Sequence, residues 1–404
     1  MSRLPEGWNF KTIKELDLDI SDGNYSSKYP KQSDFMQEGI PFIRANNIKN
    51  MTVIKEDMRY ISQQQHAELK KGHLKQNDIL ITTRGDIGQV AIVPNKFIGA
   101  NINAQIVRIG VSKSIYYKYL AYVLTDHNIQ KDINALETGT ALKQLPVKKF
   151  YLLKIPLPPL EEQKEIAEIL STVDEKIAFV DKSIEETQTL KKGLMQKLLT
   201  EGIGHTEFKE SELGRIPVEW EVMELGALGK VSMCKRVLKS QTTETGEIPF
   251  YKIGTFGKKA DSYIDKELYE EFKRKYSYPK KGDILISASG TIGRTVIFNG
   301  EAAYFQDSNI VWIANKEEKV LNIFLYYIYS VIKWTTEDTT ISRLYNDNLR
   351  NMKIIAPPLE EQKQIAQILS TTDEKLEILR EKKKFYERLK KGLMQKLLTG
   401  EVRV

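Results

Sequence analysis

The chain has 404 residues, of which 41% are hydrophobic and 28% charged, a composition typical of a globular protein with two or three domains. No apolar run approaches the ~20 residues that cross a bilayer. The N-terminal MSRLPEGW lacks the apolar core of a signal peptide, and a single cysteine, Cys234, excludes a disulfide framework. We therefore expect a cytoplasmic protein without membrane contact or a metal site, and its net charge of +7 permits a polyanionic partner.

Residues 1–155 are expected to form a first globular domain that mixes short strands with turns rich in glycine and asparagine. The run DILIT, Asp78–Thr82, is of the β type, and the loop TRGDIG at 83–88 follows it. Gly85 and Gly88 permit a tight turn in this loop. The domain contains 22 Lys and Arg against 15 Asp and Glu, so it carries a net positive charge.

One long helix is predicted within residues 156–203, from Leu160 to Thr200. Pro158 and Pro159 precede it, and two glutamates in its first turn favour a helix start. Its apolar positions recur in steps of four and three, which is a heptad seam that needs a partner helix. The seam comprises Ile166, Leu170, Val173, Ile177, Val180, Ile184, Thr187, Lys191, Leu194 and Leu198.

Residues 204–355 are expected to form a second domain of the same kind. The run DILIS, Asp283–Ser287, and the loop SGTIG at 289–293 resemble the strand and loop of the first domain. Residues 201–356 contain 22 Lys and Arg and 22 Asp and Glu, so this domain is neutral. A neutral domain can bind DNA only if its basic side chains gather on one face.

Residues 356–404 repeat the long helix. PPLEEQKEIAEILSTVDEKI at 158–177 returns as PPLEEQKQIAQILSTTDEKL at 357–376, and KKGLMQKLLT occurs unchanged at 191–200 and 390–399. We predict that the two helices pair with each other; the alternative is that each packs on a separate protein. The second seam comprises Ile365, Leu369, Thr372, Leu376, Leu379, Lys383, Tyr386, Lys390, Leu393 and Leu397.

Two further features repeat within the helices. Gly193 and Gly392 occupy equivalent places, which suggests the close approach of another backbone or a local break, because a glycine inside a helix costs roughly 1 kcal/mol relative to alanine. The Asp-Glu-Lys triplets at 174–176 and 373–375 are expected to lie on solvated helix faces. The predicted fold class is α+β: two similar mixed domains joined by two long helices in a pseudo-twofold repeat.

Polar and basic side chains in the loops are candidates for DNA contacts, because Arg, Lys, Asn and Gln bind phosphates and base edges. A solvated surface role is the alternative for each residue alone. The candidates in the first domain are Lys28, Arg44, Asn46, Asn47, Thr83, Arg84, Thr140, Lys143 and Gln144. Those in the second domain are Lys235, Arg236, Lys252, Ser289, Thr291, Arg294, Thr340 and Arg343.

Motifs for catalysis are missing from the sequence. No G-x-G-x-x-G opens a helix, no G-x-x-x-x-G-K-[ST] phosphate loop is present, and no H-E-x-x-H helix appears. The proline pairs in LPPL and APPL lack the flanking residues of an amino-methyltransferase motif. We therefore expect no catalytic site and no cofactor in this chain.

The repeated PPLEEQ-x-x-IA-x-IL segments, the GDIL-type strands with their glycine loops and the alternation of variable domains with similar helices resemble the specificity subunit of type I restriction–modification systems. The resemblance covers essentially the whole chain. It implies two target-recognition domains that each bind half of a split, asymmetric DNA site, and an antiparallel helix pair that sets the gap. It also implies two modification subunits, which methylate adenine with S-adenosylmethionine, and restriction subunits, which hydrolyse ATP.

Two other readings of the sequence come from different classes of protein. A methyltransferase fused to a DNA-binding domain would need a cofactor motif, which is missing here. A structural coiled-coil adaptor would protect no DNA sequence. Binding of a cofactor to the purified chain, or the lack of any DNA footprint, would identify these alternatives.

Overall fold

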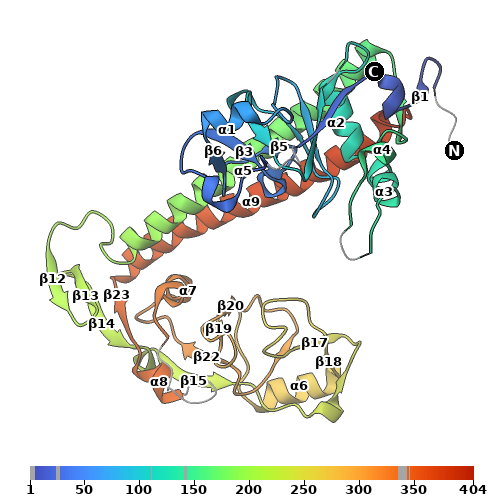
Figure 1. Ribbon diagram of the computed structural model, residues 1–404. Coiled ribbons are helices and arrows are strands. Elements are labelled where there is room, and N and C mark those ends of the chain that lie inside the picture. The colour runs from blue at the N-terminus through green and yellow to red at the C-terminus, as the bar shows by residue number, and fades with distance from the viewer. Residues whose placement is uncertain (1–4, 24–27, 111, 141–142, 335–343, 345) are drawn as a thin grey trace. The chain divides into compact units, whose positions relative to one another are not determined.

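The computed structural model describes residues 5–23, 28–110, 112–140, 143–334, 344 and 346–404. The chain divides into two units, Met1–Lys182 with Glu381–Val404, and Ser183–Arg380. Each unit contains one globular domain and one half of each long helix (Figure 1). We call the elements that precede the first long helix domain 1, and those between the two long helices domain 2.

Domain 1 is built around an antiparallel sheet whose middle strands are buried along their whole length. This sheet has the order β2(Asp19–Asp22), β10(Ile106–Gly110), β7(Ile79–Thr82), β8(Val90–Ile92). Smaller sheets are β6(Arg59–Ile61) with β3(Ile40–Ile43) and β9(Asn101–Ile102), β4(Ile48–Lys49) with β5(Thr52–Val53), and β1(Asn9–Thr12) with β11(Lys154–Leu157). The helices are α1(Gln63–Glu68), α2(Tyr117–Thr125), α3(His127–Ala135) and α4(Val147–Phe150), with 3-10 turns at Ile13–Leu16, Gln32–Asp34, Ala45–Asn47 and Asn95–Phe97.

Domain 2 repeats this plan. Its main sheet has the order β15(Gly229–Met233), β22(Ile310–Asn315), β19(Ile284–Ser287), β20(Thr295–Ile297). The second sheet has the order β16(Thr242–Thr243), β18(Tyr263–Ile264), β17(Ile248–Tyr251), β21(Tyr304–Phe305), and the pairs are β14(Glu221–Glu224) with β23(Lys353–Ala356) and β12(Phe208–Ser211) with β13(Gly214–Pro217). The helices are α6(Lys266–Lys275), α7(Asn322–Val331) and α8(Asn346–Asn351), with 3-10 turns at Leu225–Ala227 and Lys239–Gln241.

The two domains share strand order as well as sequence. In both, an edge strand of the main sheet, β2 or β15, follows the strand that pairs with the end of the domain, β1 or β14. The glycine loop connects β7 to β8 in domain 1 and β19 to β20 in domain 2. A parallel pair recurs in the smaller sheets, between β3 and β9 and between β17 and β21. The domains are therefore two copies of one fold, and the predicted fold class is confirmed.

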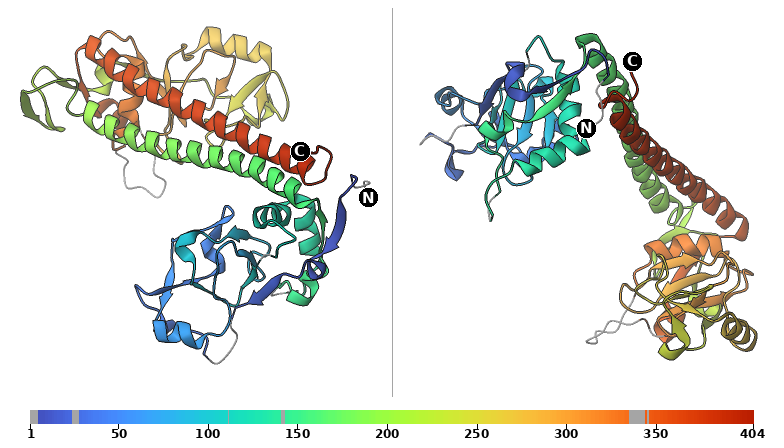
Figure 2. Two further views of the ribbon diagram at one scale, coloured as in Figure 1. Left: turned by 90° about the horizontal axis from the view of Figure 1, so that it is seen from above. Right: turned by 90° about the vertical axis from the view of Figure 1, so that its right-hand side faces the viewer.

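The long helices are α5(Leu160–Leu198) and α9(Leu359–Leu397), with 39 residues each. In the first unit, Lys383 pairs with Asp181 at 2.6 Å, and one heptad further along α9 Lys390 pairs with Asp174 at 2.6 Å, one heptad back along α5. The partner moves backwards as α9 advances, so the helices are antiparallel. They lie side by side in every view (Figures 1 and 2), and the predicted pairing of the helices is confirmed.

The predicted seam is buried or half-buried along both helices. The ends of the seam also join the domain cores: Ile166, Leu170 and Leu397 pack in the core of the first unit, and Leu198, Ile365 and Leu369 in that of the second. Seam positions in the middle of the helices are less covered. Val173, Val180, Thr187, Thr372 and Leu376 are buried, whereas Ile177, Ile184, Leu194, Leu379, Tyr386 and Leu393 are half-buried.

The interpretation of the helix glycines was wrong. Nothing lies within 4 Å of the place where a Cβ would stand at Gly193 or Gly392, so no other backbone approaches them. The helices also run through both positions without a break. The structure gives no physical reason for these two glycines.

Candidate nucleic-acid interface

The loop after the third strand of each main sheet is shaped by a buried hydroxyl. In domain 1 the Thr82 hydroxyl donates to the Asp86 carbonyl at 2.5 Å and accepts the Gln89 N–H at 2.9 Å. In domain 2 the Ser287 hydroxyl donates to the Thr291 carbonyl at 2.6 Å and accepts the Arg294 N–H at 2.8 Å. The hydroxyl at the strand end therefore holds the turn and is not available to DNA.

Glycines allow the turn that this hydroxyl closes. Gly85 and Gly88 have φ of 79° and 85°, and Gly290 and Gly293 have φ of 65° and 80°, a region that other residues rarely adopt. A Cβ on Gly293 would also lie 2.1 Å from the indole of Trp334. The shared backbone makes Arg84 equivalent to Ser289 and Gln89 equivalent to Arg294, so the two domains present different side chains at matching points.

A second segment, far along the chain, lies beside each of these loops. In domain 1 the backbone of Arg84 pairs with that of Gln144, and the Leu145 N–H donates to the Thr83 carbonyl at 2.9 Å. In domain 2 the Leu344 N–H donates to the Ala288 carbonyl at 2.9 Å. The structure thus brings four candidates of domain 1 into two adjoining segments, namely Arg84, Thr140, Lys143 and Gln144, all of them exposed.

The other candidates near these loops differ in exposure. Thr83 is buried, and its hydroxyl donates to the Gln105 carbonyl at 3.2 Å. Ser289 is half-buried and donates to the Asn309 side chain at 2.8 Å, while Thr291 is exposed. Arg294 is half-buried and donates to the Phe256 carbonyl at 3.0 Å. Thr340 and Arg343 lie outside the described residues.

Two arginines lie close together beside the smaller sheet of domain 1. Arg44 donates to the Asp57 carbonyl at 2.5 Å, and Arg59 donates to the Gln32 side chain at 2.7 Å. The Arg59 guanidinium also lies 4.7 Å from the centre of the Phe35 ring. Burial lowers the pKa of the Arg44 guanidinium, and the nearby charge of Arg59 lowers it further.

These two arginines are suited to an anion. Within the part of the chain that the structure describes, neither forms an ion pair with a carboxylate, and the buried Nε of Arg44 has no hydrogen-bond acceptor. Asn46 beside them is exposed, but Asn47 is fully buried, accepts the Arg44 N–H and donates to the Glu56 carbonyl. The sequence analysis identified Arg44 but missed Arg59. Arg59 lies in the short strand β6, and no motif in the sequence marks it.

The remaining basic candidates have partners at the surface. Lys28 pairs with Glu68 at 3.4 Å. In domain 2, Arg236 pairs with Asp307 and Lys252 with Asp261, both at 2.9 Å. The Lys235 ammonium lies 5.1 Å from the centre of the Tyr276 ring. Exposed pairs of this kind are worth about 0–1 kcal/mol, so a phosphate can compete for these cations.

The repeated EEQ segment fastens each domain to its helix. Gln163 accepts the Tyr116 N–H at 2.8 Å and donates to the Pro158 carbonyl at 2.9 Å. Its counterpart Gln362 accepts the Leu321 N–H at 2.8 Å and donates to the Pro357 carbonyl at 2.7 Å. Both glutamines are buried.

The glutamate directly before each glutamine accepts a hydrogen bond from a tryptophan. Glu162 accepts from the Trp8 indole at 3.1 Å and from Arg403 at 3.0 Å. Glu361 accepts from the Trp220 indole at 2.8 Å and lies 2.9 Å from the His205 ring. The sequence showed that these segments repeat. The structure shows that each is a joint, by which we mean a set of hydrogen bonds that holds a domain on its long helix.

The Asp-Glu-Lys triplets are only partly solvated, so that prediction was wrong for the aspartates. Asp174 accepts from the Tyr122 hydroxyl at 2.8 Å and pairs with Lys390, and Asp373 accepts from the Tyr327 hydroxyl at 3.0 Å and pairs with Lys191 at 2.5 Å. The partners come from other elements, which helix periodicity does not reveal. The glutamates and lysines of both triplets are exposed, as predicted.

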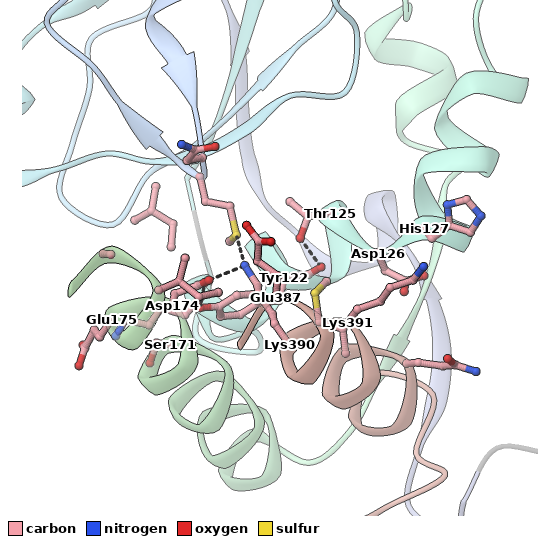
Figure 3. A pocket seen from close by; sticks show the side chains of 18 of the residues that line it. Tyr122, Thr125, Asp126, His127, Ser171, Asp174, Glu175, Glu387, Lys390 and Lys391 are labelled. Carbon is pink, nitrogen blue, oxygen red and sulfur yellow. Dashed lines mark hydrogen bonds and ion pairs between the residues drawn. The ribbon is translucent and has the colours of Figure 1, made fainter. Parts of the chain in front are cut away.

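A cleft of about 940 Å³ opens beside the first of these contacts, between domain 1 and the helices of its own unit (Figure 3). Figure 3 shows Asp174, Tyr122 and Lys390 close together in its lining, and the Lys390 ammonium lies 4.0 Å from the sulfur of Met51. His127 and Lys391 also line the cleft. The cleft carries both acidic and basic side chains, including Glu175 and Glu387, so it has no single charge.

The family model for the type I restriction modification DNA specificity domain matches residues 5–188 and 217–386. The chain belongs to this family. The two matches correspond to the two copies of the fold, each with its adjoining helix. A relative from Haemophilus influenzae named as a type I restriction enzyme specificity subunit is 49% identical over 253 residues, 62% of this chain and 63% of the relative, so that match covers less than two thirds of its length.

Other relatives match the whole chain. The relative named as the MjaX specificity subunit of a type I restriction enzyme, from Methanocaldococcus jannaschii, is 34% identical over 420 residues, 100% of this chain and 96% of the relative. Among solved structures, the S subunit of a type I restriction-modification system from M. genitalium matches with a TM-score of 0.63 at 17% identity, over 98% of this chain and 97% of that one. This likeness supports the fold alone.

Within the part of the chain that the structure describes, no helix combines the length and the apolar character that a membrane span requires. No group of three or more His, Cys, Asp or Glu side chains in that part of the chain is placed to hold a metal ion. Cys234 is buried, and burial raises the pKa of its thiol to about 12, which leaves it protonated at neutral pH.

Proposed function

We propose that the chain is the DNA-reading subunit of a type I restriction–modification complex, in which each domain binds one half of a split and asymmetric site. The observation that carries the proposal is the repeat itself. Two domains share one fold, yet they present different side chains at matching loop positions, such as Arg84 against Ser289. Two domains with the same backbone fold but different exposed side chains are suited to bind two different half-sites.

In domain 1 we propose two contact regions. The exposed loop segments with Arg84, Lys143 and Gln144 supply side chains that can reach base edges. Arg44 and Arg59 supply two cations without a carboxylate partner in the described chain, and such a pair suits a phosphate of the DNA backbone.

In domain 2 the proposed contacts are Lys235, Arg236, Lys252 and the loop at 289–294. The domain is neutral as a whole, so its affinity for DNA must depend on these local groups rather than on net charge. Their surface ion pairs are weak enough to be exchanged for phosphates.

We further propose that the helix pair sets the gap between the half-sites and binds two modification subunits. Exposed apolar side chains support the second role: Phe179 on α5 is 69% exposed, and Ile378, its counterpart on α9, is 68% exposed. Large apolar side chains at exposed positions of a helix are typical of protein contacts. Two equivalent positions suit two copies of one partner.

The chemistry is proposed to reside in the partners, with S-adenosylmethionine bound by the modification subunits and ATP by the restriction subunits. The support is the missing catalytic motifs of the sequence and the family match. A solved type I restriction–modification chain that matches over 100% of both chains, with a TM-score of 0.58, comes from work on complex assembly, which agrees with such a role.

The test is methylation mapping with the subunits reconstituted. The isolated chain should not methylate DNA, and addition of modification subunits should produce methylation at one split motif. Replacing residues 206–353 with the corresponding domain of another specificity subunit should change one half-site and leave the gap unchanged. Methyl transfer by the chain alone, or a change of both half-sites, would contradict the proposal.

A further inference from the structure

The same three side chains meet where each domain contacts the helix pair. In the first unit they are Tyr122 on α2, Asp174 on α5 and Lys390 on α9, which we call junction triad 1. Tyr122 donates to one carboxylate oxygen of Asp174 at 2.8 Å, and Lys390 pairs with the other at 2.6 Å. The Lys390 ammonium also lies 5.4 Å from the centre of the Tyr122 ring.

Junction triad 2, in the second unit, has the same geometry with the helices exchanged. Tyr327 on α7 donates to one oxygen of Asp373 at 3.0 Å, and Lys191 on α5 pairs with the other at 2.5 Å. The Lys191 ammonium lies 5.8 Å from the centre of the Tyr327 ring. Each triad therefore joins three elements: a domain helix, α5 and α9.

The lysines of both triads occupy heptad seam positions, where an apolar side chain would pack better. A polar residue at such a position lowers stability but fixes the register of the helices. In the native register each lysine faces an aspartate. A shift of one heptad that brought Lys390 opposite Asp181 would bring Lys191 opposite Arg380, and the reverse shift would place Lys390 opposite the buried Ala167.

The tyrosines extend this register to the domains. Other contacts between α2 and α5 near Tyr122 are apolar: Leu120 and Val123 of α2 lie in one core with Ile166 and Leu170 of α5. Apolar packing is non-directional, whereas a hydrogen bond to a charged oxygen requires one distance and one angle. The tyrosine hydroxyl therefore adds a directional contact to those of Gln163 and Glu162, and it is the contact that also involves the partner helix through Lys390.

We propose that the two junction triads are positioning residues for spacer selection: they hold each domain at one place and angle on the helix pair, and so restrict the gap between the half-sites without contacting DNA. The inference rests on the proposed function. It separates two properties of the subunit, because the loops determine which bases are bound and the triads determine how strictly the distance between them is enforced.

The test is a methylation assay on the complex of the full chain with modification subunits. The substrates are duplexes with the native half-sites and spacers of the native length, or longer or shorter by one base pair. The variants are Tyr122→Phe, which removes one hydroxyl, and Lys390→Met, which keeps an unbranched side chain in the seam. Lys391→Met, at the exposed neighbour of Lys390, is the matched control.

We expect methylation of the shifted spacers, relative to the native spacer, to rise by about tenfold in both variants, which is the discrimination that one hydrogen bond to a charged group provides. The half-sites should be unchanged and Lys391→Met should behave as the wild type. Tyr327→Phe should have the same effect through the second junction.

Two results would overturn the inference. One is an unchanged spacer profile in both Tyr122→Phe and Tyr327→Phe, which retain every other contact of the junctions. The other is an equal loss of methylation at all spacers, which is the result of a merely structural role. If the wild-type complex methylates no split motif, the proposed function itself is wrong and the inference is lost with it.

Discussion

We propose that the domains bind the half-sites and that the helix pair sets the gap between them. Lengthening the helix pair should therefore change the length of the gap and leave the bases of the half-sites unchanged. Because the helices are antiparallel and paired, the extra heptad has to be added to both. A duplicate of residues 176–182 placed after Lys182, with a duplicate of 375–381 after Glu381, adds opposite segments. Both copies carry seam residues, and all three lysine–aspartate pairs keep their partners.

The magnitude follows from helix geometry. Seven residues at about 1.5 Å each extend the pair by about 10 Å. Along a duplex with about 3.4 Å per base pair this corresponds to about three base pairs. Tilt of the helices relative to the DNA makes this an upper bound. Three base pairs also turn the second half-site by about a third of a helical turn, so the assembly must twist the DNA or accept two added base pairs.

The assay is methylation mapping of the extended complex against random spacers. We expect the same two half-sites with a gap longer by about two or three base pairs. A two-residue insertion at the same two places is the control, because two residues turn the following seam by about 200° to the opposite face of each helix and should prevent assembly. An extended variant that keeps the native gap, or that binds altered half-sites, would refute the spacer role of the helices.

Three further predictions follow from single side chains. Arg84→Ala should cost about 1–3 kcal/mol of binding and relax one position of one half-site if the guanidinium contacts a base, and should weaken all sequences alike if it contacts a phosphate; unchanged binding in a competition assay would remove it from the interface. Leu376→Asp should lower the free energy of unfolding by at least about 3 kcal/mol, because a charge replaces a buried seam side chain, and denaturant unfolding measures it. Glu361→Gln should cost about 1–2 kcal/mol because Trp220 loses a charged acceptor, whereas the exposed Glu360→Gln should cost nothing measurable in the same unfolding experiment.

The fold could be predicted from the sequence because its evidence is periodic. The sequence predicts one long helix from Leu160 to Thr200 and a second within residues 356–404. The structure has them at Leu160–Leu198 and Leu359–Leu397. A heptad seam depends on spacing alone, and a repeat depends only on comparison of the chain with itself. Neither requires knowledge of which distant residues meet.

The candidate contacts were harder to predict because residue type does not reveal burial. Asn47 has the amide that binds adenine in other proteins, but here its amide satisfies two backbone groups of a turn. Thr83 is likewise buried against the Gln105 carbonyl. Asn, Asp, Ser and Thr side chains also stabilise turns by hydrogen bonds to the nearby backbone, and only the tertiary structure distinguishes this role from contact with a ligand.

The aspartates of the helices show the opposite error. Asp174 was assigned to a solvated face because helix periodicity places it beside the seam and not in it. The structure brings Tyr122 to it from another helix, and Lys390 from the antiparallel partner. A sequence pattern within one helix cannot report contacts made by side chains that arrive from outside it.

The distribution of repeated and unrepeated residues then has a physical reason. Several of the repeated residues lie at the joints: Gln163 and Gln362 each bind two backbone groups, and the aspartates at 174 and 373 each bind a tyrosine and a lysine. A joint works only in one geometry, so both copies need the same side chains. The loops differ where the exposed Arg84 corresponds to the half-buried Ser289, because the backbone turn is held by the hydroxyls of Thr82 and Ser287 and not by these two side chains. Such positions can change without loss of the fold, as the proposed binding of two different half-sites requires.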